Sequence, residues 1–234
     1  MNFGKPGTLI VGIAGLPRVR AVLFDLDGTL VDSVPDIAVA VDRLLADLGR
    51  EPAGEARVRH WVGNGGRMLV RRALAFDPAG VPDDDPLLPR AMEIFFAHYH
   101  DTNGRASRLY PGVAEALDGF AARGLPMATI TNKPHRYIEP LYAQLGILHH
   151  FPVLIGGDTL AVRKPDPAPL LHACERLGVA AHEALMVGDS RNDIEAARAA
   201  GCPVVAVDYG YNYGRPIAEE GPDRVVSDLR ALLD

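Results

Sequence analysis

The feature that most constrains this chain is the alternation of short apolar runs with segments of helical spacing. Each apolar run stops at a polar or glycine-bearing turn, as buried parallel strands do, and the runs lie at residues 21–24, 126–130, 152–155, 184–187 and 203–207. Amphipathic segments stand between them at residues 112–123, 134–145, 167–177 and 192–200, and several close on glycine, as helices commonly do. This order predicts an α/β fold with a parallel sheet flanked by helices.

One connection is too long for that alternation. About a hundred residues separate the end of the first run at Asp25 from the end of the second at Thr131, whereas a βαβ unit takes only ~30. Helical patterning occurs in this stretch at residues 37–48, 56–62, 67–76 and 87–100, without a convincing strand. We therefore expect a core domain of residues 19–32 and 108–234 and an inserted helical-bundle cap domain of residues 33–107. Residues 1–18 are expected to form an N-terminal extension.

The composition limits the classes of partner. The chain has 234 residues, 48% of them hydrophobic, which is enough to bury a core without disulfides. Cys174 and Cys202 are therefore expected to be small buried residues in a reducing compartment. A net charge of −6 and a pI of about 5.7, without a cluster of Lys and Arg, argue against nucleic acid or an anionic membrane as the partner. Residues 8–16 are apolar but too few to span a bilayer. We expect a cytoplasmic protein, monomeric or homodimeric, with a small-molecule partner.

Two carboxylates follow the first apolar run. Asp25 and Asp27 stand two residues apart, and Gly28 after them permits a tight turn. In open α/β sheets, ligands bind where the strands end at their carboxyl side. Because crowded carboxylates repel each other, we expect a cation between them, and an all-oxygen site with a substrate phosphate suits Mg²⁺. Taken alone, such a pair of acids is more often a turn former or a helix cap.

Three further polar segments follow later apolar runs. Thr131 and Asn132 offer a hydroxyl and an amide that can hold a phosphate oxygen. Lys164 precedes a proline and offers an ammonium, while Asp189 and Asp193 place two more acids after the fourth run. Singly, each segment has an ordinary alternative, which is a loop or the cap of the next helix.

Together these segments are far more specific than any one of them. They read DLDGT from residue 25, TN from residue 131, KP from residue 164 and GDSxxD from residue 188. In this order they resemble the four signatures of the haloacid dehalogenase-like (HAD) hydrolase superfamily. The resemblance covers roughly residues 19–208 and implies a Rossmann-like core with a helical cap inserted after the first signature.

Softer features are similar to one subgroup of that superfamily, the phosphoglycolate phosphatases. They are DLDGTLVDS from residue 25, WVGNG from residue 61, TNKP from residue 131, GDTL from residue 157, RKPDP from residue 163 and GYN from residue 210. Related sugar-phosphate phosphatases share some of these strings, so the subgroup is less specific than the superfamily.

The resemblance implies roles for the acids. Asp25 is expected to be the nucleophile that accepts the phosphoryl group, which splits one displacement into two easier ones. Asp27 is expected to act as general acid and then general base. Asp25, the backbone carbonyl of Asp27, and Asp189 are expected to bind Mg²⁺. Dehalogenases of this fold lack an acid corresponding to Asp27, so its presence favours attack on phosphorus.

The resemblance also implies roles for the remaining polar groups. Thr131 and Lys164 are expected to stabilise the charge on the phosphoryl oxygens, and Asn132 to bind substrate. Asp193 is expected to position Lys164 or a metal-bound water rather than to contact the metal.

Specificity is expected from the cap, because the core recognises only the phosphoryl group. The run Gly63-Asn64-Gly65-Gly66 can bring backbone amides to a substrate, and Arg67 can pair with a carboxylate. We therefore predict that Asn64 and Arg67 bind substrate. The alternatives are a turn between helices for the glycines and a solvent-facing charge for Arg67.

The predicted function is Mg²⁺-dependent hydrolysis of 2-phosphoglycolate to glycolate and phosphate. Rival substrates are a sugar phosphate such as N-acetylmuramic acid 6-phosphate, or pyrophosphate. A phosphosugar mutase and a catalytically silent regulatory scaffold are further alternatives. A silent scaffold would have no need to retain the whole set of catalytic residues, which are Asp25, Asp27, Thr131, Lys164 and Asp189.

Overall fold

The computed structural model describes residues 19–233, and its centre is a parallel sheet. Within these residues the sheet has six strands in the order β5-β4-β1-β6-β7-β8, and every pairing in it is parallel. The strands are β1 (Ala21–Phe24), β4 (Met127–Ile130), β5 (Val153–Ile155), β6 (Ala184–Gly188), β7 (Val204–Val207) and β8 (Arg224–Val226). The predicted α/β fold is thus confirmed. Residues 1–18, predicted to be an extension, lie outside the described residues.

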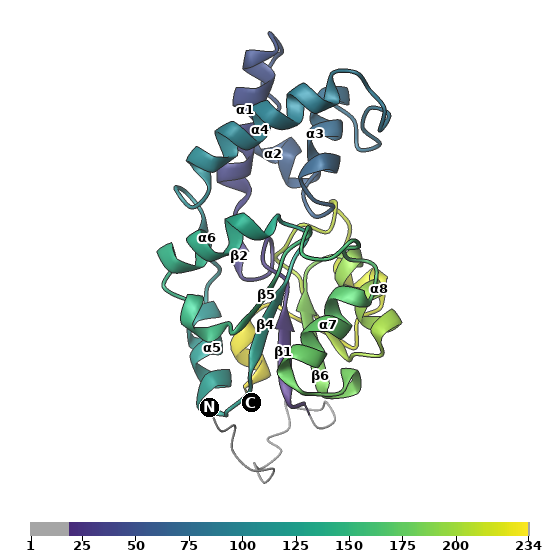
Figure 1. Ribbon diagram of the computed structural model, residues 1–234. Helices are drawn as coiled ribbons and strands as arrows, with labels where there is room; N and C mark the ends of the chain where they lie inside the picture. The colour runs from purple at the N-terminus through teal and green to yellow at the C-terminus, as the bar shows by residue number, and fades with distance from the viewer. Residues whose placement is uncertain (1–18, 234) are drawn as a thin grey trace.

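Helices cover both faces of the sheet because successive side chains of β1 point to opposite sides. Val22 and Phe24 pack into a core cluster with α5 and α6, whereas Ala21 and Leu23 pack into another cluster with α7 and α8. Figure 1 shows these helices on the two sides of the sheet. Their bounds are α5 (Val113–Ala122), α6 (Ile138–Gln144), α7 (Ala168–Leu177) and α8 (Arg191–Ala200). A sheet buried on both faces explains the continuous apolar runs.

The chain reverses its direction of travel across the sheet at β1. After β1 it builds β4 and β5 on one side, and then crosses to build β6, β7 and β8 on the other. The connections therefore diverge at the carboxyl end of β1, which is the position where ligands bind in open α/β sheets.

A second group of helices stands above that end of the sheet (Figure 1). They are α1 (Val34–Asp47), α2 (Glu55–Arg59), α3 (Gly66–Ala75) and α4 (Leu88–Thr102), and they form a core of their own around residues such as Trp61 and Phe95. The chain enters and leaves this helical unit through an antiparallel pair, β2 (Val31–Asp32) and β3 (Arg108–Leu109). The helices match the predicted ones, and the domain division after residue 32 and before residue 108 stays a prediction.

The structure departs from the predicted pattern in several places, and the antiparallel pair of β2 and β3 is one of them. β8 was not predicted, because two of its three residues are only partly buried and it lies at an edge of the sheet. The predicted helix 134–145 is divided into the 3₁₀ turn η1 (His135–Tyr137) and α6. Pro140 lacks the N–H that would bond to the carbonyl of Arg136, so a continuous α-helix cannot form there.

Short 3₁₀ helices complete the described chain. They are η2 (Leu148–His150), η3 (Ala181–Glu183), η4 (Ile217–Glu220) and η5 (Leu229–Leu232). Cys174 and Cys202 are buried and free, as predicted. In residues 19–233 no helix combines the length and apolar character needed to cross a bilayer.

Candidate active site

The ends of neighbouring strands bring together side chains that are far apart in the sequence. Asp25 follows β1, Thr131 follows β4, and Asp189 follows β6. Lys164, from the loop after β5, places its Nζ 2.9 Å from Asp25 Oδ1. Asp25, Asp189 and Asp193 each offer a carboxylate oxygen within 4.8 Å of the others. The predicted convergence of these segments on one place is therefore present.

The turn after β1 requires glycine. The carbonyl of Leu26 accepts hydrogen bonds from the backbone N–H groups of Thr29, Leu30 and Val31, which closes the turn tightly. Gly28 has a φ of 94°, a conformation that glycine adopts at little cost. A Cβ at Gly28 would lie 2.1 Å from Asp189 Oδ2, so glycine lets the turn close against the next strand end.

Lys164 is held as a buried ammonium. Its Nζ donates to the carbonyl of Ile130 at 2.5 Å and to Asp193 Oδ1 at 2.6 Å. Burial alone would lower the pKa of Lys164, but the carboxylates of Asp193 and Asp25 outweigh that effect and raise it. Lys164 therefore stays charged at neutral pH and faces Asp25.

Asp193 holds the other side of Lys164 and the start of α8. It is fully buried, and its Oδ2 accepts from the backbone N–H of Ser190 at 3.0 Å, from Ser190 Oγ at 2.8 Å and from the N–H of Asp189 at 3.2 Å. These bonds occupy Asp193, which is consistent with the expected positioning role.

Asp25 and Asp189 form a carboxylate pair that a cation would stabilise. Burial raises the pKa of Asp25 to about 6, although Lys164 opposes the shift. Burial, followed by the charges of Asp25 and Asp193, raises the pKa of Asp189 well above its usual value. Asp189 accepts from Thr29 Oγ1 at 3.0 Å and from the N–H of Tyr211 at 2.6 Å. These bonds fix its direction without neutralising it.

The donor set fits Mg²⁺. Asp25 Oδ1 is buried and, apart from its ion pair with Lys164 Nζ at 2.9 Å, has no hydrogen-bond partner within residues 19–233. The carbonyl of Asp27 likewise accepts none from the described residues, so it is available as a ligand. Asp25, Asp189 and this carbonyl offer only oxygen atoms, which is the chemistry that Mg²⁺ prefers.

Asp27 is anchored through one of its two carboxylate oxygens. Ser33 Oγ donates to Asp27 Oδ1 at 2.6 Å, and Lys133 Nζ donates to the same oxygen at 2.9 Å. Within the described chain no hydrogen bond reaches Oδ2, which leaves that oxygen available for proton transfer. Sequence reasoning gave no role to Lys133, although it lies in the TNKP string.

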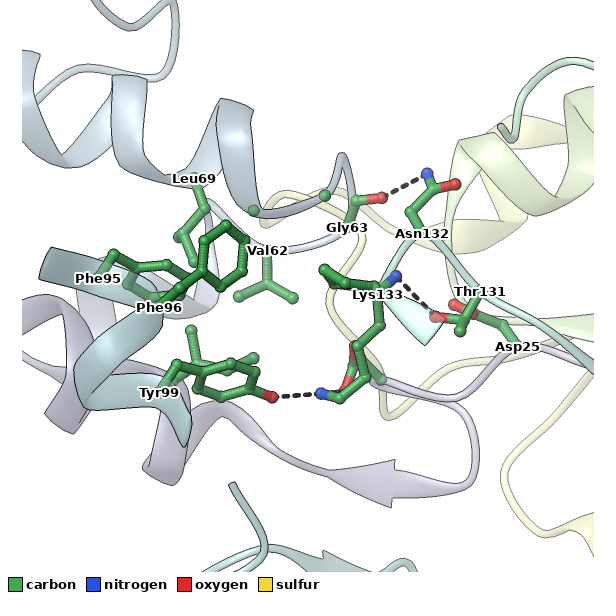
Figure 2. A pocket seen from close by; sticks show the side chains of 15 residues that line it. Asp25, Val62, Gly63, Leu69, Phe95, Phe96, Tyr99, Thr131, Asn132 and Lys133 are labelled. Carbon is green, nitrogen blue, oxygen red and sulfur yellow. Dashed lines mark hydrogen bonds and ion pairs between the residues drawn. The ribbon is translucent and has the colours of Figure 1, made fainter. Parts of the chain in front are cut away.

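A pocket lies between the helical unit and the carboxyl end of the sheet (Figure 2). The side of the core is polar and the side of the helical unit is mostly apolar, which is common for small-molecule sites. The core contributes Asp25, Asp27, Thr131, Asn132, Lys133 and Pro134. The helical unit contributes Ile37, Val62, Gly63, Gly65, Gly66, Leu69, Phe95, Phe96 and Tyr99.

The glycine-rich loop between α2 and α3 is fastened to the core. Asn132 Nδ2 donates to the carbonyl of Gly63 at 2.9 Å and to that of Lys164 at 3.0 Å. Asn192 Nδ2 donates to the same carbonyl of Gly63 at 3.1 Å. Asn64 Nδ2 contacts Asn192 Oδ1 at 3.4 Å. Asn132 therefore reaches the pocket, whereas the Asn64 side chain serves the contact between helical unit and core.

The structure does not bring Arg67 into the pocket. Its guanidinium is exposed and donates to Asp83 Oδ1 at 2.9 Å and to the carbonyl of Asp83 at 2.8 Å. This ion pair on the outside of α3 directs the charge of Arg67 away from the pocket. The geometry corresponds to the solvent-facing alternative for this residue.

A parallel α/β sheet that gathers carboxylates and a buried ammonium at its switch point belongs to the class of enzymes that bind small anionic ligands at strand ends. The family model described as haloacid dehalogenase-like hydrolase matches residues 19–201. The chain belongs to this family of hydrolases, as its signatures predicted.

Curated relatives are similar over most of the chain. One from Pseudomonas putida, named phosphoglycolate phosphatase, is 52% identical over 97% of this chain and 80% of its own length. Another with the same name, from Yersinia pseudotuberculosis, is 49% identical over 92% of this chain and 92% of its own. A solved structure described as a predicted phosphoglycolate phosphatase from Haemophilus somnus is 38% identical, with a TM-score of 0.86 over 94% of this chain and 98% of the other.

Proposed function

We propose that this protein is a Mg²⁺-dependent phosphomonoester hydrolase that converts 2-phosphoglycolate and water to glycolate and phosphate. The names of the relatives support the substrate. The observation that carries the chemistry is the cluster in which Lys164 lies 2.9 Å from Asp25, next to the oxygens of Asp189.

Asp25 is the nucleophile in this proposal. One of its carboxylate oxygens attacks phosphorus, the bond from phosphorus to the ester oxygen breaks, and a phosphoaspartate forms. Water then attacks that phosphorus and restores the carboxylate. The turn at Gly28 and the contact with Lys164 hold Asp25 in one position, which reduces the cost of reaching the attack geometry.

Asp27 moves the protons. Its Oδ1 is anchored by Ser33 and Lys133, so Oδ2 gives a proton to the departing alkoxide and later takes one from the attacking water. Anchoring one oxygen keeps the other near the leaving group in both steps.

Thr131 and Lys164 stabilise the negative charge on the phosphoryl oxygens, with Asn132 beside them. Asp25, Asp189 and the carbonyl of Asp27 would hold Mg²⁺. When bound, the ion offsets the repulsion between the anionic nucleophile and the anionic phosphate. Asp193 keeps Lys164 in place.

We further propose that residues 33–107 are a cap domain that closes the site from above and shapes the room for the leaving group. Its apolar residues in the pocket exclude water from the reacting groups, which strengthens the electrostatic contacts there. The ligand is a small phosphorylated metabolite, because the phosphoryl site is enclosed by the cap on one side and the sheet on the other.

The test measures phosphate release from a panel of small phosphate compounds with and without Mg²⁺. The panel contains 2-phosphoglycolate, a sugar phosphate and pyrophosphate. The highest kcat/KM is expected for 2-phosphoglycolate, with loss of turnover when the metal is removed by a chelator. A sugar phosphate or pyrophosphate as best substrate would reassign the substrate, and no turnover of any compound would refute the proposal.

A further inference from the structure

Lys133 is a second buried lysine in the site, and the mechanism above uses it only as an anchor. It follows Asn132 at the end of β4 and is 5% exposed. Among the described residues that line the pocket, it is the one with a positive charge. Its ammonium lies between the core and α4, where it contacts the hydroxyl of Tyr99 (Figure 2).

One of the three N–H groups of the Lys133 ammonium has no acceptor among the described residues. An ammonium has three N–H groups. Lys133 Nζ donates to Asp27 Oδ1 at 2.9 Å and to Tyr99 Oη, and no third acceptor occurs within residues 19–233. Lys164, by comparison, has three oxygen partners around its Nζ, from Ile130, Asp193 and Asp25.

Lys133 lies on the side of the site where the proposed mechanism puts the leaving group, beside Asp27. It contacts Asp27, which protonates the ester oxygen, whereas Lys164 contacts Asp25, which attacks phosphorus. The remaining walls around the leaving group are apolar, from residues such as Val62, Leu69 and Phe95. An anionic group on the leaving alcohol would therefore find one charged partner in this part of the pocket.

We propose that Lys133 is a specificity-determining residue that binds an anionic group of the leaving alcohol. The site then selects phosphate esters of short hydroxy acids over esters of neutral alcohols. This inference rests on the proposed function and adds the source of its selectivity. In 2-phosphoglycolate the carboxylate is joined to the carbon that bears the ester oxygen, so a group bound to Lys133 stays next to Asp27.

The burial of Lys133 supports this role. Removing an ammonium from water is costly unless it is paired, and a specific anion in the pocket completes its coordination. Burial alone would lower the pKa of Lys133, but Asp27 and Tyr99 outweigh that effect and raise it. The charge is thus present before substrate arrives.

The test compares 2-phosphoglycolate with 2-hydroxyethyl phosphate, in which CH₂OH replaces the carboxylate. In the wild-type enzyme, kcat/KM is expected to be about 10- to 100-fold higher for the carboxylate, the range of a hydrogen bond to a charged group. In Lys133→Met the ratio of kcat/KM for 2-phosphoglycolate to kcat/KM for 2-hydroxyethyl phosphate is expected to fall to about one or below. A ratio between two substrates cancels any common effect of Lys133 on Asp27.

Ser33→Ala is the matched control. Ser33 Oγ donates to the same Asp27 oxygen at 2.6 Å but carries no charge. This variant is expected to slow both substrates by the same factor and to keep the wild-type preference. If Lys133→Met also slows both substrates equally, Lys133 is only a positioning residue for Asp27 and the inference is overturned.

The wild-type enzyme provides a test that does not depend on the folding of a variant. Equal kcat/KM for the two esters would overturn the role of Lys133 while leaving the phosphatase function standing. Turnover of neither ester, or of any phosphomonoester, would instead remove the proposed function itself. The two failures are therefore distinguishable.

Discussion

At the end of β1, the carboxylate of Asp25 is buried, and burying this charge has a free-energy cost. Burial raises the pKa of Asp25 from 3.8 to about 6, so at neutral pH the metal-free protein keeps a charge that its surroundings disfavour. The shift corresponds to a free energy on the order of 3 kcal/mol. The ionised carboxylate of Asp25, the proposed nucleophile, therefore destabilises the fold in the absence of a cation.

Replacing this carboxylate by an amide gives the first prediction. Asp25→Asn removes the proposed nucleophile, so turnover of 2-phosphoglycolate is expected to be lost. The metal-free variant is expected to melt at the same temperature as the wild type or a few degrees higher at neutral pH, since an unfavourable charge has gone. Phosphate release and thermal unfolding in the presence of a chelator measure the two effects. Full activity would refute the assignment, and a much lower melting temperature would refute the electrostatic account.

The pH dependence of stability follows from the same residue. Because the pKa of Asp25 is raised on folding, its contribution to stability is fully present below pH 3.8 and is lost as pH rises through about 6. In the proposed site Mg²⁺ would bind the deprotonated form of Asp25, so protons would compete with it. The increase in melting temperature caused by Mg²⁺ is expected to be larger at neutral pH than at about pH 5. An equal increase at both pH values would contradict this linkage.

At the scale of elements, one buried acid connects the first helix of the helical unit to the segment by which the chain leaves that unit. Asp36, in the first turn of α1, accepts hydrogen bonds from the backbone N–H groups of Gly104, Ala106 and Ser107 at 2.7 to 2.9 Å, and from Ser107 Oγ at 2.6 Å. The segment that returns to the core after α4 is thereby fixed to the helix that left it.

Removal of this acid is expected to destabilise the fold. Asp36→Ala leaves several buried N–H groups without acceptors, which costs on the order of 3 kcal/mol. Chemical denaturation measures the free energy of unfolding. Asp101→Ala, an exposed acid on α4, is the control and should change little. An Asp36→Ala variant as stable as that control would show that the exit segment is held by other contacts.

The elements themselves could be predicted from the sequence where one local pattern decides them. β1 is buried on both faces, so its apolar run marks its ends, and the acids of the site follow such runs. Lys133 and Asn192 could not be recognised in this way, because their roles depend on how α4 and the glycine-rich loop pack on the core. Arg67 was expected near substrate, but its pairing with Asp83 depends on the path of a loop that periodicity does not define.

At the scale of the whole molecule, the pocket exists because the helical unit rests on the sheet. Several polar contacts join the two parts. Among them, Asn132 and Asn192 both donate to the carbonyl of Gly63, and Lys133 contacts Tyr99. Asn192 also donates to Tyr213 Oη at 2.8 Å. Of the two asparagines, Asn192 does not line the pocket, so its contribution to closure can be tested apart from substrate contacts.

Asn192→Ala is expected to loosen the glycine-rich loop without touching the reacting groups. Losing the hydrogen bonds to Gly63 and Asn64 weakens the contact between loop and core by about one net hydrogen bond each. KM should therefore rise several-fold for both 2-phosphoglycolate and 2-hydroxyethyl phosphate, while the ratio of their KM values stays constant. Hydrogen exchange should become faster at residues 63–66 and remain unchanged in β1 and β4. Arg191→Ala, whose exposed side chain pairs with Glu195 on the surface of α8, should leave both readouts unchanged. If hydrogen exchange in the loop does not change in Asn192→Ala, packing of the apolar residues maintains the closed state. The polar contacts at Gly63 then serve only to position the loop.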